Sequence, residues 1–85
     1  MKILVIDDDH MVRYTVSKLL QRNGYDVVTA SDGSRGMVLV RDEHPDVVIT
    51  DIIMPEQEGI ETIGMLRRQY PHVKIHRDLR RRSYS

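Results

Sequence analysis

Three aspartates follow short apolar runs, at positions where several carboxylates could meet. Asp7 and Asp8 come directly after the run at residues 2–6, and Asp51 comes after the run at residues 47–50. If these runs are neighbouring parallel strands, the three carboxylates converge at the carboxyl ends of the strands, where open α/β sheets bind ligands. Adjacent carboxylates repel one another and resist ionising together. A divalent cation relieves this repulsion, and oxygen ligands with room for water suit Mg²⁺.

The segments around these aspartates alternate between strand-like and helix-like patterns. Apolar, largely β-branched runs predict strands, and apolar residues at intervals of three and four predict helices. With short connections, the resulting order predicts an α/β fold with a parallel sheet and right-handed crossovers. The predicted strands occupy residues 2–6, 25–30, 47–50 and a run from residue 73, and the predicted helices occupy residues 10–22, 33–43 and 60–70.

The helix expected over residues 10–22 has recognisable ends. Asp9 is more typical of an N-cap than of a metal ligand, and Asn23-Gly24 is typical of a left-handed helix end. Arg13 and Lys18 are expected to be solvated charges on the helix surface. The stripe expected to face the sheet consists of Val12, Val16, Leu19 and Leu20.

The composition limits the chain to one small domain. It has 85 residues and no cysteine, so neither a disulfide nor a thiolate metal site can support the fold. Its apolar runs are far shorter than the ~20 residues that span a bilayer, and the apolar N-terminus is too short for a signal peptide. We therefore expect a cytoplasmic protein without membrane contact. The net charge of the chain is zero, but it is unevenly distributed. Residues 1–75 have a net charge of −3, and residues 76–85 have a net charge of +3.

The segment that begins at Asp51 carries a longer motif. Residues 51–59 have the sequence DIIMPEQEG, which resembles the Asp-x-x-Met-Pro-x-x-x-Gly signature of response-regulator receiver domains, the CheY-like family of two-component signalling. The acidic residues 7–9 and the turns Asp32-Gly33 and Pro45-Asp46 also match that family. The resemblance covers residues 2 to about 75. It implies a flavodoxin-like (CheY-like) open parallel sheet with helices on both faces, for which CheY is a standard example.

The resemblance also implies roles for the aspartates. Asp51 would be the phosphoacceptor, taking a phosphoryl group from a histidine kinase or a phosphotransfer protein. Mg²⁺ would be bound by Asp8 directly, by Asp7 mainly through water, by Asp51, and by the backbone carbonyl of Ile53. The metal would neutralise charge on the transferred phosphoryl oxygens. Such a domain is regulatory and not an enzyme, because it catalyses at most its own phosphorylation and dephosphorylation.

The resemblance stops near the fourth predicted strand. The family continues with further β/α units, and it places a Ser or Thr at the end of strand four and a Lys at the end of strand five, neither of which we find. We therefore expect a C-terminally truncated receiver over residues 1–75, with slow phosphorylation, and an irregular basic tail over residues 76–85. The arginines of the tail could form a basic arm for nucleic acid, because arginine clusters bind phosphates. They form no nucleic-acid-binding motif, so the alternative that we favour is a truncated or out-of-frame end without such a role.

A chain of this length has little material with which to cover both faces of the sheet. Small scaffolds without disulfides often associate, and an unpaired strand edge recruits another chain. We therefore expect a homodimer through an exposed strand edge or helix face. Val73 and Ile75 are expected to be buried in that contact or in the fourth strand beside it.

Two other functions remain open. A receiver that lacks the Ser/Thr and the Lys could act only as a protein-interaction module that is not phosphorylated. A haloacid-dehalogenase-like phosphatase also begins with a strand and an Asp-x-Asp motif, which Asp7 and Asp9 fit. That family normally has Thr or Val two residues after the second Asp, where this chain has Met11, and the motif at residues 51–59 has no place in it.

Overall fold

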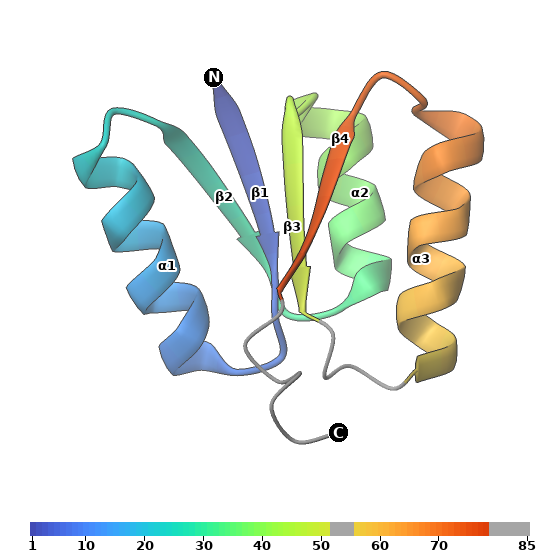
Figure 1. Ribbon diagram of the computed structural model, residues 1–85, viewed down its shortest axis with the longest axis horizontal. Helices are drawn as coiled ribbons and strands as arrows, with labels where there is room; N and C mark the ends of the chain where they lie inside the picture. Colours follow the sequence, from blue (N-terminus) through green and yellow to red (C-terminus); the bar gives the residue numbers. More distant parts are fainter. Residues whose placement is uncertain (52–55, 79–85) are drawn as a thin grey trace.

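The computed structural model of the chain describes residues 1–51 and 56–78, in which strands and helices alternate (Figure 1). The elements lie within a few residues of the bounds expected from the apolar pattern. In chain order they are β1 (Lys2–Ile6), α1 (His10–Arg22), β2 (Asp26–Ala30), α2 (Gly33–Glu43), β3 (Val47–Asp51), α3 (Glu56–Gln69) and β4 (Lys74–Asp78).

The strands form one parallel sheet in the order β2-β1-β3-β4. The two β-branched runs that precede the aspartates are therefore its central pair, β1 and β3. Figure 1 shows α1 on one side of this sheet and α2 and α3 on the other. This arrangement is the predicted open parallel sheet with helices on both faces.

The main core lies between the sheet and the helices α2 and α3. Leu4 and Ile6 enter it from β1, and Leu66 enters it from α3 with none of its surface exposed. Val73, directly before β4, is buried in the same core, and the half-buried Ile75 of β4 packs against it. The remaining buried members are Ala30, Val40 and Val48.

Helix α2 approaches β1 very closely at Gly36. A Cβ atom built at this glycine would overlap Cδ1 of Ile6, whose side chain is itself buried. Because core side chains are packed at high density, Ile6 has little room to yield. The absence of a side chain at position 36 therefore sets how near α2 lies to the sheet.

The opposite face of the sheet is covered less completely. Helix α1 packs against β2 and β1, and it has no fully buried residue. Leu19 is 59% exposed, so its assignment to the sheet-facing stripe was wrong. The contact stripe is narrow because α1 is the only described helix on this face, and Leu19 lies beside it. Val47 and Ile49 of β3 are only half-buried.

Local caps fix where α1 begins and ends. The Asp9 carboxylate accepts hydrogen bonds from the backbone N–H of Met11 at 2.9 Å and of Val12 at 3.4 Å, which confirms its prediction as an N-cap. At the other end Gly24 has φ of 89°, the left-handed conformation that glycine adopts without strain.

Replacing Asp9 by alanine is expected to lower the free energy of unfolding by about 1 kcal/mol, because two N–H groups of the first helical turn lose their acceptor. Urea denaturation without metal measures this change. Asp9→Asn is the matched control, since its side-chain oxygen can still accept these bonds. Equal losses in both variants would contradict the capping role.

Strand β4 continues beyond the boundary expected at residue 75. Its last residues, His76 to Asp78, pair with β3 in register, so these three are strand rather than irregular tail. The prediction for residues 79–85 falls outside the described residues. Within the described part of the chain, no helix has the length and apolar character needed to span a membrane.

Candidate functional site

The strand order brings the three aspartates to one edge of the sheet. β1 and β3 are neighbours, and Ile6 pairs with Thr50 across them. Asp7 follows Ile6 directly, and Asp51 follows Thr50 as the last residue of β3. The condition for convergence, that the two runs are neighbouring parallel strands, is therefore met at the level of the backbone. This is the carboxyl edge of the sheet, where α/β folds bind ligands.

The carboxylate of Asp7 is buried and held by the turn that follows β1. Only 2% of the residue is exposed. Its Oδ1 atom accepts a hydrogen bond of 2.8 Å from the backbone N–H of Asp9, and its own N–H donates to the carbonyl of Ala30 at 3.1 Å. Asp8 is exposed beside it. The pair thus presents one fixed carboxylate and one that reaches solvent.

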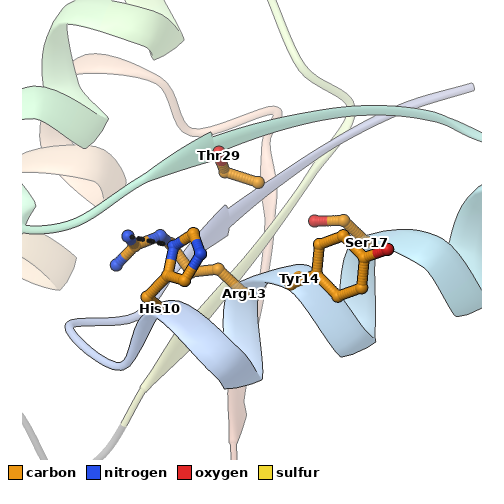
Figure 2. Close-up of a pocket in the computed structure, with 5 residues that line it drawn as sticks. All are labelled: His10, Arg13, Tyr14, Ser17 and Thr29. Carbon is orange, nitrogen blue, oxygen red and sulfur yellow. Dashed lines mark hydrogen bonds between the residues drawn. The ribbon is translucent and has the colours of Figure 1, made fainter.

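Arg13 has a structural role that its sequence position did not suggest. Its Nη1 atom donates a hydrogen bond of 2.6 Å to the backbone carbonyl of Asp7, and its Nη2 atom lies 3.4 Å from Nδ1 of His10 (Figure 2). The side chain is half-buried, so the prediction of a solvated charge was wrong. Because the bond spans the turn after β1, it ties α1 to the segment that carries Asp7 and Asp8.

A shallow cavity of about 310 Å³ lies between the first half of α1 and β2. Figure 2 shows Tyr14 and Ser17 along α1, with Thr29 of β2 across from them. Ser17 Oγ is buried and makes no hydrogen bond. Neither Asp7 nor Asp8 is among its lining residues, but His10 and Arg13 are, so the cavity begins next to the turn that carries these two aspartates.

Two of the predicted site groups are not described in atomic detail. The side chain of Asp51 and all of Ile53 lie outside the described residues. Among the groups that are described, no three acidic or histidine side chains gather closely enough to hold a metal ion. The roles of Asp7, Asp8, Asp51 and Ile53 in metal binding stay predictions. The donor chemistry fits Mg²⁺, because each proposed donor is a carboxylate or carbonyl oxygen.

The amino-acid sequence is similar to those of known proteins. A sequence model described as the response regulator receiver domain matches residues 3–76. The alkaline phosphatase synthesis transcriptional regulatory protein PhoP of Bacillus subtilis is 41% identical over 68 residues, covering 80% of this chain and 28% of PhoP. The chain thus spans less than a third of that relative.

Solved structures share the fold over most of the chain. Chemotaxis protein CheY4 of Vibrio cholerae has a TM-score of 0.82 and 36% identity, over 89% of this chain and 65% of CheY4. Response regulator TrrA of Thermotoga maritima, solved with Mg²⁺ and BeF, has a TM-score of 0.80 and 35% identity, over 87% of this chain and 64% of TrrA. A further structure, of histidine kinase ThkA in complex with TrrA, matches with a TM-score of 0.80 and 34% identity, over 89% of this chain and 66% of that one.

Proposed function

This chain belongs to the response regulator receiver domain family of two-component systems, and from that membership we propose that it accepts a phosphoryl group on Asp51. The observation that carries the proposal is the strand order, which brings the end of β3 beside the Asp7-Asp8 turn at the ligand-binding edge of the sheet. The experiment that tests it is intact-mass measurement after incubation with acetyl phosphate and Mg²⁺.

In the proposed reaction an oxygen of the Asp51 carboxylate attacks the phosphorus atom of the donor. The new O–P bond forms as the bond between phosphorus and the leaving group breaks, and the electron pair of that bond departs with the leaving group. The product is an acyl phosphate on Asp51. Asp7 and Asp8 contribute negative oxygens beside this position, and the hydrogen bond from Arg13 to the Asp7 carbonyl keeps their turn in place.

The residues that would hold Mg²⁺ are Asp7, Asp8, Asp51 and the carbonyl of Ile53. When bound, the ion supplies positive charge that offsets the charge on the transferring phosphoryl oxygens. Support comes from TrrA, which was solved with Mg²⁺ and BeF.

A histidine kinase is the proposed phosphoryl donor, or a phosphotransfer protein that carries the same phosphohistidine. The TrrA relative is solved in complex with the histidine kinase ThkA. On this chain, α1 begins directly after the aspartate turn and exposes large side chains at Met11 (66%) and Tyr14 (57%). Exposed apolar side chains beside a reactive group are suited to contact with a protein partner.

Mg²⁺ is expected to raise the melting temperature, because it relieves repulsion among the carboxylates that the sheet brings together. At metal concentrations well above the dissociation constant the gain is about 1–3 kcal/mol, and each kcal/mol corresponds to about 4–8 °C in a domain of this size. Thermal unfolding followed by circular dichroism with and without millimolar MgCl₂ measures it.

The variant Asp51→Asn is expected to show a smaller metal effect and a higher melting temperature without metal, since one of the repelling charges is gone. Asp26→Asn is the matched control. Asp26 is exposed and is the first residue of β2, so it lies at the end of the strand away from the carboxyl edge. This variant should keep the full increase in melting temperature on adding Mg²⁺. An unchanged melting temperature on adding Mg²⁺ to the unaltered protein would contradict the site.

A second candidate function is a protein-interaction module that is not phosphorylated. The exposed apolar residues of α1, Met11, Tyr14 and Leu19, favour it, because they offer a binding surface that does not depend on Asp51. Binding to a histidine kinase without any phosphoryl uptake from it or from acetyl phosphate would select this function.

We also propose that the chain forms a homodimer. Val47 and Ile49 are only half-buried on the face of β3 opposite to the core residue Val48, while α1 packs mainly against β2 and β1. In the described residues β4 is the last strand of the sheet. Light scattering at micromolar concentration tests this proposal, and a monomer at all concentrations would exclude it.

A further inference from the structure

Asp7 is held by hydrogen bonds that involve three parts of the chain. Its N–H donates to the carbonyl of Ala30, the last residue of β2, at 3.1 Å. Its Oδ1 atom accepts from the N–H of Asp9, in the turn after β1, at 2.8 Å. Its carbonyl accepts from Nη1 of Arg13, on α1, at 2.6 Å. The position of Asp7 is therefore set from the sheet, from the turn and from the helix.

The hydrogen bond from Arg13 differs from the other two. It comes from a charged side chain outside the turn, so it can be removed without altering an aspartate or the backbone. A guanidinium N–H that donates to an oxygen makes a charge-assisted bond, which is shorter and stronger than a bond between neutral groups. The distance of 2.6 Å agrees with a bond of this kind.

Arg13 is itself fixed in place by the first turn of α1. Its N–H donates to the carbonyl of Asp9 at 3.0 Å, and the carboxylate of Asp9 caps the same turn. The Nη2 atom of Arg13 lies 3.4 Å from Nδ1 of His10, so the guanidinium contacts two groups at once (Figure 2). The side chain is also half-buried. A side chain that is held in this way can hold another group in a defined position.

The carbonyl that Arg13 holds belongs to the peptide group that joins Asp7 to Asp8. A peptide group is planar, so fixing its oxygen fixes the orientation of the whole group. Asp8 is exposed, so packing does not hold its carboxylate in place. The direction of that carboxylate therefore depends on the peptide group that precedes it, and through this group on Arg13.

We propose that Arg13 is a positioning residue for Mg²⁺. Its bond to the Asp7 carbonyl orients the peptide group between the two aspartates, so that both carboxylates are in place before the metal binds. This inference rests on the Mg²⁺ site proposed above and deepens it. Arg13 acts through the turn and does not contact the ion. Groups that orient metal ligands in this way typically contribute about 10–100-fold to metal affinity.

The positive charge of Arg13 acts in the opposite sense. A cation close to a metal site repels Mg²⁺, so removing the charge alone would tighten binding, whereas losing the orientation of the turn would weaken it. A purely structural role would lower the free energy of unfolding without changing the affinity of the folded protein. The direction in which the dissociation constant changes therefore distinguishes the three roles.

Arg13→Met removes the guanidinium and keeps an unbranched side chain that suits a helix. The dissociation constant for Mg²⁺ is expected to rise about 10-fold, as measured by isothermal titration calorimetry with MgCl₂ on protein that circular dichroism shows to be folded. Arg13→Lys keeps the charge but has no fork, so it replaces at most one of the two contacts. Its dissociation constant should lie between those of the unaltered protein and Arg13→Met.

Arg22→Met is the matched control. Arg22 is the last residue of α1 and is exposed, so the same chemical change is made on the same helix away from the aspartate turn. The affinity for Mg²⁺ should not change in this variant. If Arg13→Met does not fold, Arg13→Gln replaces it, because its shorter side chain ends before the position of the guanidinium. The same rise in the dissociation constant is expected there.

Hydrogen exchange without metal tests the turn directly. The N–H of Asp9 donates to the Asp7 carboxylate across the turn, so its exchange should become about 10-fold faster in Arg13→Met when the turn is released. The rate is compared with that of the Leu4 amide, which lies in the central strand β1 and reports unfolding of the sheet. A change confined to Asp9 is expected.

The outcomes separate the role of Arg13 from the site on which it depends. An unchanged or tighter affinity for Mg²⁺ in the folded Arg13 variants overturns the positioning role and leaves the metal site standing, and so does an equal loss in Arg22→Met. Exchange at Asp9 that rises no more than at Leu4 overturns it as well. Absence of Mg²⁺ binding to the unaltered protein overturns both the site and the role of Arg13.

Discussion

Replacing Asp51 by asparagine is expected to abolish phosphoryl uptake from acetyl phosphate and Mg²⁺. An amide has no negative oxygen with which to attack phosphorus, and it cannot form the acyl phosphate. In the unaltered protein the measurement is the gain in intact mass of one phosphoryl group, and peptide mapping places it on the segment that contains residue 51. The effect is the largest expected of any substitution on activity, since the accepting atom itself is removed.

Asp26→Asn is the control for this experiment, because it removes the same kind of charge at an exposed position remote from the carboxyl edge. It should be labelled as fast as the unaltered protein. A mass gain that persists in Asp51→Asn at the unaltered rate would show that another residue accepts the phosphoryl group. Removing Mg²⁺ with a chelator should stop labelling in both the unaltered and the control protein.

Leu4→Ala is expected to have the largest effect on stability, a loss of about 3–5 kcal/mol in the free energy of unfolding. Leu4 lies in the central strand β1 with none of its surface exposed, so the change removes buried methyl groups and leaves a cavity. Native domains have only about 5–15 kcal/mol of net stability, and small ones lie near the lower end. Urea denaturation at 25 °C should show a much lower midpoint or an unfolded chain.

Leu19→Ala is the matched control, because it makes the same chemical change at a side chain that is 59% exposed. A loss below about 0.5 kcal/mol is expected there. Equal losses at the two positions would mean that α1 buries Leu19 in solution, and the narrow contact stripe of α1 would then be wrong.

The local pattern of the sequence predicted most of the fold. β-Branched apolar runs and the caps at Asp9 and Gly24 act within a few residues, so the order and approximate bounds of the elements could be predicted without tertiary information. Leu19 and Arg13 were assigned wrongly because their surroundings depend on how α1 sits on the sheet. The periodic apolar stripe of α1 does not indicate how wide the buried contact with the sheet is, so it did not exclude Leu19. No local sequence pattern indicates that the guanidinium of Arg13 donates a hydrogen bond to the carbonyl of Asp7.

The candidate site was predictable only in part. The residues themselves indicated three carboxylates after two strands, and their meeting depended on whether those strands are neighbours. The family resemblance supplied that order, and the observed sheet agrees with it. The individual roles of Asp51 and Ile53 depend on side-chain and loop geometry that neither periodicity nor strand order determines, so they stay predictions.

The close approach at Gly36 has a consequence for how relatives of this chain can vary. Because a Cβ at position 36 would overlap Cδ1 of Ile6, the two positions share one small volume between α2 and β1. A relative with alanine at position 36 needs a shorter side chain at position 6, or a helix α2 that lies further from the sheet. Substitutions at these two sites should therefore be correlated across an alignment, and the pair offers a check on whether α2 has been aligned in the correct register.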